Sequence, residues 1–142
     1  MIKLNSIKKF FSLFMTAVLL FSFGACSKYK SSYKAIGLVR MNTSHSCEAS
    51  FYSLEGRLVF KLKKTDVGSE GDIYCSVQVD EGEIRLYYDI YGVKQELAHV
   101  KAGETLTERR GYVEGGYTVY IIIEAVKGTR GKIVVDLDGA GA

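Results

Sequence analysis

The sequence predicts an all-β fold: an antiparallel two-sheet β-sandwich of seven to eight strands that follows an N-terminal apolar segment. Past residue 34, apolar and polar residues alternate at a period of two, which is typical of half-buried strands. The alternating runs are rich in β-branched and aromatic residues, which favour strands. Glycine-containing turns interrupt the runs at intervals of about 8–12 residues, the spacing expected of a sandwich.

Four strands are expected in the first half of the domain, over 35–41, 47–54, 57–64 and 72–79. Their inward apolar sets are Cys47 and Ala49, then Leu58, Phe60 and Leu62, then Ile73, Cys75, Val77 and Val79. Turns are expected at 54–56 and 66–71, because both segments contain glycine, which reaches positive φ at little cost.

Four more strands are expected over 83–91, 94–100, 117–126 and 130–137, with a glycine turn at 128–131 between the last two. Their inward sets include Ile84, Leu86 and Tyr88, then Val119, Ile121 and Ile123, then Ile133, Val135 and Leu137. Val59 and Ile122 are apolar in the outward phase, so we expect part of the outer surface to be covered by the tether or a partner. The apolar run 120–123 favours a central strand, because an exposed edge of this kind promotes aggregation.

The N-terminal segment has the three-part layout of a secretory signal. Lys3, Lys8 and Lys9 precede an apolar run that begins at Phe10, and Gly24 and Ala25 stand directly before Cys26. This ending resembles the lipobox of bacterial lipoproteins. The resemblance implies a signal helix in residues 1–25, fatty-acyl (palmitate-type) lipidation of Cys26, a polar tether over 26–34 and a sandwich domain over 35–142. It further implies a lipid anchor in the bacterial cell membrane, on the extracytoplasmic face.

Two other interpretations of the N-terminal segment remain open. One is an ordinary cleaved signal with a cysteine nearby by chance. The other is a retained transmembrane anchor, although the apolar run 10–25 has 16 residues and a spanning helix needs about 20.

The net charge of +3 belongs wholly to the first 25 residues, and 16 basic and 16 acidic residues remain from Cys26 onward. A nucleic-acid-binding domain usually carries a basic surface. The neutral balance therefore gives no support to a nucleic-acid partner.

The closing segment 100–137 also resembles a known architecture. The order Lys101-Ala102-Gly103-Glu104, then Glu114-Gly115-Gly116-Tyr117-Thr118-Val119, then Gly131-Lys132-Ile133-Val134-Val135 looks like the last strands of small jelly-roll or Ig-like sandwiches. It is similar to a segment of small Gram-positive surface lipoproteins of unknown function. The resemblance implies a sandwich on a cell surface and carries over no functional residue.

Cys47 and Cys75 are the two cysteines left if Cys26 is lipidated. Outside the cytoplasm such a pair is a candidate disulfide, which would close a loop of about 28 residues and contribute about 3–3.5 kcal/mol. The alternative is two buried free thiols, because cysteine is often buried without a bond.

Catalytic and metal-binding motifs are sparse, and neither a cofactor nor a metal is predicted. Ser44 or Ser46 with His45 or His99 would give a nominal Ser-His-Asp set, but no Gly-x-Ser-x-Gly elbow is present. His45 and Cys47 lack the further ligands that zinc requires. The acidic groups 80–83 and 136–138 are candidates for calcium, and turn-forming acids explain them equally well.

Tyrosine is the one surplus residue, with ten copies, and five of them fall in the outward phase: Tyr52, Tyr74, Tyr87, Tyr91 and Tyr120. Tyr87, Tyr91 and Tyr120 would form a flat binding face if they share one sheet, since tyrosine gives large amphipathic contact area. The other interpretation is that tyrosine is simply a good strand former.

The sequence therefore favours a non-catalytic envelope lipoprotein that binds an envelope protein or peptide. A carbohydrate-binding module is the alternative, and a small hydrolase or metal-dependent enzyme is a third.

Overall fold

The computed structural model describes residues 28–138, so the predicted signal peptide and Cys26 lie outside the described residues. Contacts divide the chain into two units, Met1–Lys30 and Ser31–Ala142, and every strand belongs to the second. Strand β1 begins at Ser32, three residues before the expected start of the domain and inside the expected tether. No segment of 28–138 forms an apolar helix of membrane-spanning length.

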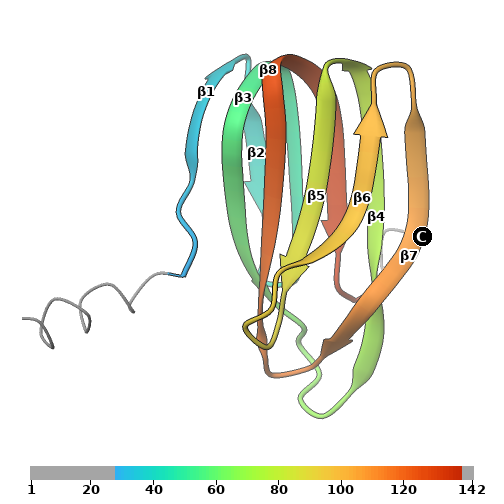
Figure 1. Ribbon diagram of the computed structural model, residues 1–142. Coiled ribbons are helices and arrows are strands. Elements are labelled where there is room, and N and C mark those ends of the chain that lie inside the picture. The colour runs from blue at the N-terminus through green and yellow to red at the C-terminus, as the bar shows by residue number, and fades with distance from the viewer. Residues whose placement is uncertain (1–27, 139–142) are drawn as a thin grey trace, which may run out of the picture. The chain divides into compact units, whose positions relative to one another are not determined.

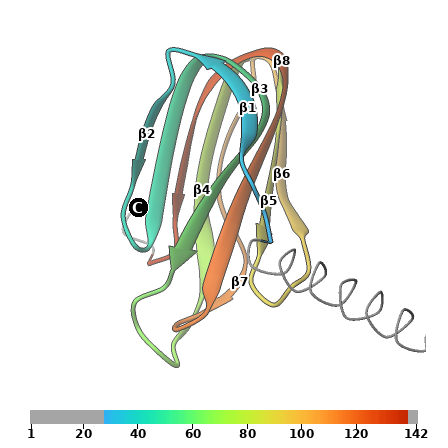
Figure 2. The same ribbon diagram turned by 90° about the vertical axis from the view of Figure 1, so that its left-hand side faces the viewer.

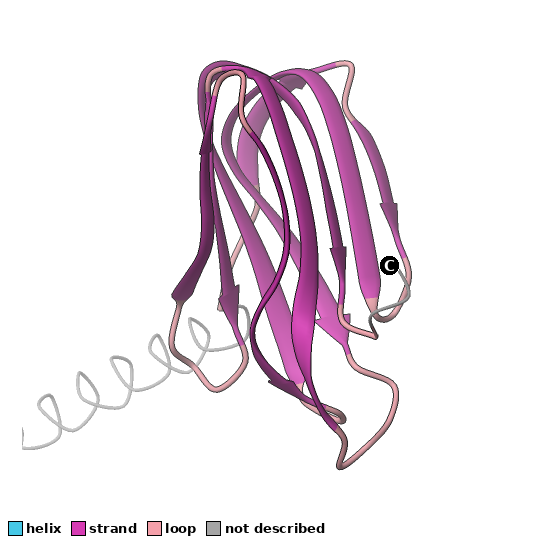
Figure 3. Cartoon of the chain, turned by 90° about the vertical axis from the view of Figure 1, so that its right-hand side faces the viewer, coloured by secondary structure: helices cyan, strands magenta, loops and turns pink. Residues whose placement is uncertain are grey.

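Within residues 28–138, eight antiparallel strands make up the fold (Figures 1 and 3). They are β1 Ser32–Ile36, β2 Val39–Asn42, β3 Ser46–Lys63, β4 Glu70–Glu81, β5 Glu83–Asp89, β6 Gln95–Lys101, β7 Thr105–Glu114 and β8 Thr118–Asp136.

Hydrogen bonds join these strands into one sheet, which folds over on itself into two layers because β3 and β8 each belong to both. Sheet I contains β1, the second half of β3, the first half of β8, β5 and β6. Sheet II contains β2, the first half of β3, the second half of β8, β4 and β7. Figure 1 shows β3 and β8 curving over the upper end from one layer to the other. The predicted two-sheet sandwich is confirmed.

The long bent strands correct two of the expected turns. The turn predicted at 54–56 is a pair of register shifts within β3, and the one predicted at 128–131 lies within β8. Gly56 has φ +110°, and a Cβ there would overlap the Ser32 carbonyl oxygen of β1. Glycine therefore bends a continuous strand at this point, as it does at barrel corners, and the chain does not reverse.

Two further differences concern the edges of the sandwich. The strand expected over 35–41 is divided at Gly37, whose φ is +64°, into β1 and β2, which follow β3 from sheet I to sheet II (Figure 2). β7 was not predicted, because its polar, largely exposed residues 105–112 show no apolar alternation. The number of strands agrees with the prediction, although their boundaries differ.

The core lies between the two sheets and consists of the predicted inward residues. Sheet I contributes Leu58, Phe60, Leu62, Ile84, Leu86, Val119, Ile121 and Ile123, and sheet II contributes Ile73, Val77, Val79, Ile133 and Val135. β8 is paired on both sides, with β3 along its length and with β5 and β4 on its two halves. The predicted central position of the run 120–123 is therefore confirmed.

Candidate functional site

The structure brings together two of the three tyrosines predicted to form a binding face. Tyr87 pairs with Ile122 and Tyr120 pairs with Asp89 between β5 and β8, so Tyr87 and Tyr120 are diagonal neighbours on the outer surface of sheet I. Tyr91 follows the end of β5 and lies against Tyr117 of the β7–β8 turn, with 5.4 Å between the ring centroids. Tyr87 and Tyr120 thus lie on strands of sheet I, whereas Tyr91 lies in the β5–β6 loop.

The aromatic surface of sheet I is covered by charged side chains of the same chain. The Lys94 ammonium lies 4.1 Å from the centroid of the Tyr87 ring and 2.9 Å from Oε1 of Glu124. Arg57 approaches the same carboxylate at 3.1 Å. Ile122, between Val59 and Tyr87 in the register, is 0% exposed. Of the expected cover by the tether or a partner, the described residues show one tether contact: the Val59 N–H donates a hydrogen bond to the Ser31 hydroxyl at 2.9 Å.

The environment of Glu124 keeps this cover charged. Burial raises the pKa of the Glu124 carboxyl, but hydrogen bonds from Lys94 and Arg57 outweigh that effect, so the pKa lies below its usual value. The carboxylate is therefore ionised at neutral pH and holds Lys94 across the surface.

The outer surface of sheet II is organised differently, in rows of residues that lie side by side across neighbouring strands. Ser50, Lys132 and Gln78 form one row across β3, β8 and β4, and Glu48, Val134 and Ser76 form the next. Because outward residues alternate along each strand, these rows present mostly hydroxyl, amide and charged groups.

Two hollows follow one another on this surface. The upper hollow, of about 310 Å³, is lined by Ser50, Tyr52, Gln78, Asp80, Arg130 and Lys132, together with Gly37, Phe51 and Gly131. The lower hollow, of about 270 Å³, is lined by residues 41–43 and 46–48 with Val134 and Asp136. We call the two together the sheet II groove. From Tyr52 to Ser46 along β3 it extends for about 20 Å, at about 3.3 Å per residue.

The upper hollow combines an exposed ring with hydrogen-bonding groups. Tyr52 is 65% exposed, and the Arg130 guanidinium carbon lies 5.7 Å from the centroid of its ring. Arg130 also approaches Asp80 at 3.8 Å and Glu81 at 3.5 Å. The Gln78 amide donates a hydrogen bond to Asp80 at 3.4 Å. Aromatic, amide, carboxylate and guanidinium groups thus converge on one hollow.

An ion pair joins the two hollows. Lys132, which lines the upper hollow, lies 3.0 Å from the carboxylate of Glu48, which lines the lower one. Both basic side chains that line the groove, Arg130 and Lys132, are therefore paired with acidic ones. Sequence reasoning placed Tyr52 in the outward phase, but it did not find the groove, because the groove depends on the pairing of β3 with β8 and β4.

The residues of the nominal catalytic set do not form a relay. Ser44 Oγ lies 3.5 Å from Nδ1 of His45, and Asp138 Oδ2 lies 3.6 Å from the same nitrogen. A Ser-His-Asp triad needs the serine and the aspartate on opposite ring nitrogens. Ser46 bonds to Thr43, and His99 of β6 bonds to Glu83 of β5.

The acidic groups proposed for calcium are engaged by protein groups. Asp80 and Glu81 pair with Arg130, Asp136 accepts a hydrogen bond from the backbone N–H of Asp138, and Asp138 pairs with Lys64 at 3.7 Å. Within the described part of the chain, no three His, Cys, Asp or Glu side chains gather closely enough to hold a metal ion.

Cys47 and Cys75 are both buried and free, so the candidate disulfide is not formed. Both residues pair with Val135, from opposite sides of β8. Two strand spacings separate their backbones by roughly 9–10 Å, beyond the roughly 7 Å limit for a disulfide. Burial raises the pKa of both thiols, that of Cys47 to about 12.

Comparisons with known proteins complete this description. Neither the protein-family models nor the curated proteins include a match to the chain. Among solved structures, the chain is similar to a family 29 carbohydrate-binding module, at 12% identity and a TM-score of 0.40, over 75% of each chain. It is similar to a family 29 module variant complexed with mannohexaose, at 12% identity and a TM-score of 0.40, over 77% of this chain and 90% of that one.

A third similar structure is the C-terminal family 6 carbohydrate-binding module of a marine laminarinase from Zobellia galactanivorans. The identity is 10% and the TM-score 0.40, over 75% of this chain and 99% of that chain.

Proposed function

We propose that this chain is a non-catalytic carbohydrate-binding domain that holds a linear, neutral polysaccharide in the sheet II groove. The observation that carries the proposal is the alignment of two hollows along β3 and β8, with an exposed tyrosine ring at one end. Binding sites for small ligands combine apolar and aromatic surface with a few placed polar groups.

The chemistry of the groove matches that of a sugar chain. One side of a pyranose ring is a flat patch of C–H groups, which an exposed ring such as Tyr52 can contact. The hydroxyl groups at the sugar edge both donate and accept hydrogen bonds. Gln78, Asp80 and Ser50 offer complementary donors and acceptors on the two strands that flank β8.

The ion pairing of the groove favours a neutral polysaccharide over an anionic one. Each basic group of the groove that has been described has an acidic partner, Arg130 with Asp80 and Lys132 with Glu48. An anionic ligand would compete with these carboxylates. Hydroxyl groups can instead bridge such pairs, accepting from the cation and donating to the carboxylate.

The same pairing supports binding without hydrolysis. Glycoside hydrolysis needs a protonated general acid and a second carboxylate across the scissile bond. Asp80 and Glu48 are each held in an ion pair with a basic side chain, so neither carboxyl is presented free to a glycosidic bond.

Anchoring forms the second part of the proposal. The residues Gly24, Ala25 and Cys26 support lipidation at Cys26, which would place the domain on the extracytoplasmic face of a bacterial membrane. Two or more acyl chains hold a protein stably on a bilayer. Metabolic labelling with a palmitate analogue tests this part: the full chain is expected to be labelled, and Cys26→Ala to abolish the label.

A second candidate function is peptide binding at the β2 edge. Among the described strands β2 pairs only with β3, and its outward residues Val39 and Met41 are exposed. Edge strands of this kind accept an added strand from a peptide. Val39→Lys is expected to weaken the binding of a peptide partner and to leave glycan binding unchanged, because Val39 lines neither hollow of the groove.

Affinity electrophoresis of the full chain in gels that contain neutral β-glucans, mannans or xylans tests the main function. Retardation is expected in at least one gel, and Tyr52→Ala is expected to reduce the affinity about tenfold, or about 1.4 kcal/mol. Tyr52→Phe keeps the ring and is the matched control. Retardation that survives Tyr52→Ala and Gln78→Ala together would place the ligand elsewhere, and mobility unchanged in every gel would reject the proposal.

A further inference from the structure

Exposed apolar side chains gather at the end of the sandwich opposite the β3 and β8 bends. Val67 comes from the β3–β4 loop, Tyr91 and Val93 come from the β5–β6 loop, and Tyr117 comes from the β7–β8 turn. Val67 and Val93 are 84% and 63% exposed, and both tyrosines are exposed as well. We call these four residues the loop-end patch.

The patch is continuous across the three loops. The rings of Tyr91 and Tyr117 are in edge-to-face contact, with 5.4 Å between their centroids. A Cβ added at Gly116, the residue directly before Tyr117, would lie 3.5 Å from Cγ1 of Val67, so Val67 packs over the β7–β8 turn. Contiguous exposed apolar surface marks a site of contact with a protein or a membrane.

Backbone hydrogen bonds hold the loops of the patch in place. The Gly115 N–H donates to the Ser69 carbonyl at 2.8 Å, and the Gly68 N–H donates to the Gly115 carbonyl at 3.3 Å. In the β5–β6 loop, the Gly92 N–H donates to the buried Asp89 carboxylate at 2.7 Å. The patch is therefore formed before any partner binds.

The polar groups beside the patch are bonded within the chain. The Tyr91 hydroxyl bonds to the Glu114 carboxylate, and the Tyr112 hydroxyl donates to the same carboxylate at 2.8 Å; these bonds lower the pKa of Glu114. Bonded polar groups cost less to remove from bulk water. Tyrosine is enriched at membrane–water interfaces, because its ring is apolar and its hydroxyl is polar. This end of the domain therefore suits the headgroup region of a bilayer.

The course of the chain ahead of β1 points to the same end. β1 is antiparallel to β3, with Ser32 beside Arg57, so the residues before Ser32 continue toward Lys63 and the loops. The Ser31 hydroxyl accepts a hydrogen bond from the Val59 N–H at 2.9 Å. The last residue before β1 thus already follows β3 in this direction.

The length of the tether matches the distance to the loops. Cys26 and Ser32 are six positions apart, and an extended chain spans at most about 3.3–3.6 Å per residue, or about 20–22 Å here. The strand from Arg57, beside Ser32, to Lys63 also covers six positions, or about 20 Å. The tether can therefore reach the level of the loops, and it is too short to hold them away from a bilayer that they face.

We propose that the loop-end patch contacts the surface of the lipid bilayer in which the acylated Cys26 is anchored. The inference rests on the anchoring part of the proposed function and is independent of carbohydrate binding. The contact is shallow: the valine side chains and tyrosine rings lie among the headgroups and the first acyl carbons. A deeper position would bury the ionised Glu114 carboxylate, which is costly.

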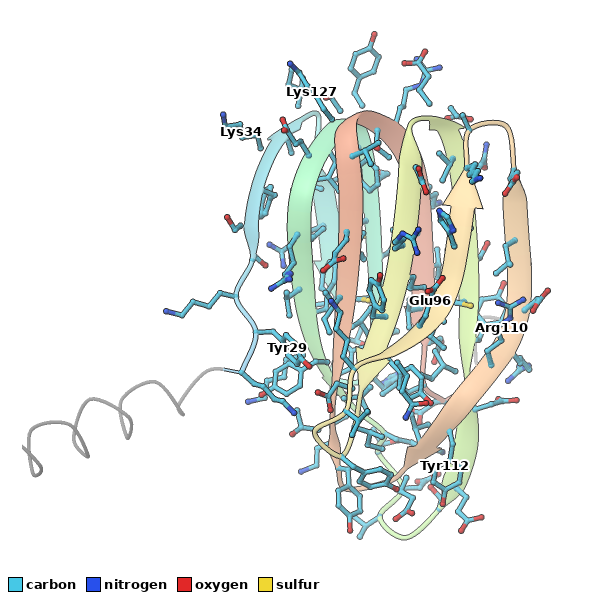
Figure 4. All side chains as sticks on the ribbon, in the orientation of Figure 1. Tyr29, Lys34, Glu96, Arg110, Tyr112 and Lys127 are labelled. Atoms are coloured by element: carbon cyan, nitrogen blue, oxygen red, sulfur yellow. The ribbon has the colours of Figure 1, made fainter. Side chains whose placement is uncertain are left out.

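The upper end of the sandwich is the rival docking surface. Figure 4 shows Lys34 and Lys127 at that end and Tyr112 at the lower end, and the adjacent Ile36 and Val126 are exposed. The chain ahead of β1 runs away from the upper end, however. Docking there would also bring the bilayer close to the upper hollow of the sheet II groove, whereas docking by the loop-end patch leaves that hollow open.

The test determines which end of the domain touches the bilayer. The full, acylated chain is reconstituted in phosphatidylcholine vesicles that contain lipids with a nitroxide quencher high on the acyl chain. Val67→Cys or Val126→Cys carries a bimane label, and Cys47 and Cys75 are buried in the folded protein. The label at Val67→Cys is expected to be quenched at least about threefold more strongly, because only a group within the interface meets the quencher. Equal quenching, or stronger quenching of Val126→Cys, would overturn the proposal.

Charge substitutions test whether the apolar contact sets this orientation. A bimane label at Val93→Cys reports on the same end of the domain. Adding Val67→Asp is expected to reduce the quenching of that label by about half or more, because a carboxylate is costly to place in the interface. Val126→Asp adds the same charge at an exposed valine of the opposite end and is the matched control, which should change nothing. Unchanged quenching in a folded Val67→Asp chain would show that the patch makes no contact.

Failure of the anchor and failure of the docking give different results. A chain that carries no acyl group and does not sediment with the vesicles would overturn the anchor and, with it, the docking. A chain that sediments through its acyl group while the Val67→Cys label stays unquenched would overturn the docking alone. Neither result bears on retardation in the glycan gels.

Discussion

Tyrosine side chains have different surroundings on the two outer surfaces of the sandwich. On sheet I, Tyr87 lies under the Lys94 ammonium, and Ile122 beside it is fully buried. On sheet II, Tyr52 is 65% exposed beside a hollow lined by polar side chains, with the Arg130 guanidinium carbon 5.7 Å from its ring centroid. The extent to which neighbouring side chains cover an outward tyrosine therefore decides how much of its ring a ligand can reach. In sheet I that cover comes from the β5–β6 loop, which no strand pattern can locate.

The strongest test of this difference compares two outward residues of the same strand. Ile122 faces outward from β8 in sheet I and is fully buried, whereas Val134 faces outward from β8 in sheet II and is partly exposed. Ile122→Ala is expected to lower the free energy of unfolding by about 2–4 kcal/mol, as for a core residue. Val134→Ala should cost about 1 kcal/mol or less. Urea denaturation measures both, and equal costs would contradict a sealed sheet I surface.

The next test removes the cover itself. Lys94→Ala takes away the contact with the Tyr87 ring and one ion pair to Glu124, and is expected to cost about 1 kcal/mol of stability. Glycan affinity should not change, because the groove lies on the other sheet. A gain in glycan affinity would mean that the uncovered Tyr87 surface is the binding site.

The stabilising effect of Lys94, measured as the difference in stability between the parent chain and Lys94→Ala, should depend on pH. Because the pKa of Glu124 is lowered in the folded protein from its ordinary value of 4.5, its contribution is present above that value and is lost as the pH falls through the folded pKa. The stability difference between the parent chain and Lys94→Ala should therefore shrink below about pH 4.5. A difference that stays constant down to the acid limit would show that Glu124 is not the partner that matters.

A smaller effect sharpens the description of sheet II. If the two hollows form one groove, oligosaccharides long enough to span both should bind several-fold more tightly than those that fill only one. Lys132→Met breaks the ion pair with Glu48 between the hollows and should lower the affinity for the long ligands about two- to fivefold, within the range for an exposed pair. Calorimetry on a series of chain lengths gives the answer, and affinity independent of length would reduce the groove to a single hollow.

The smallest expected effect concerns the core beneath sheet II. Since Cys47 and Cys75 are free and lie on either side of β8, a reducing agent should leave the midpoint of thermal unfolding unchanged. Both thiols should resist alkylation until the protein unfolds, because burial raises their pKa. A lower midpoint under reduction would show that the two cysteines are bonded.

The sequence predicted well wherever burial imposes alternation. The inward sets of β4, β5 and the first half of β8 are core residues as expected, because a half-buried strand must alternate. Gly56 and Gly128 misled the prediction, because glycine bends a continuous strand as readily as it ends one. Strand β7 was not predicted, because an edge strand with few buried residues has no apolar period to detect.

The candidate sites were harder to predict than the fold. The groove needs Ser50, Lys132 and Gln78 side by side, and that juxtaposition follows from pairing between strands far apart in the sequence. The prediction of a disulfide was wrong for the same reason. Both cysteines face inward as expected, but β8 lies between the two strands that carry them. Phase along one strand gives the side on which a residue lies, and only the strand order gives its neighbours.

The central claim is that the open surface of sheet II binds carbohydrate and the covered surface of sheet I does not. Isothermal titration of one retarding polysaccharide into the parent chain, Tyr52→Ala and Tyr87→Ala tests it most directly. Tyr52→Ala is expected to bind about tenfold more weakly, with Tyr87→Ala indistinguishable from the parent chain once both are shown to be folded. Loss of binding in Tyr87→Ala with Tyr52→Ala unaffected would contradict the account.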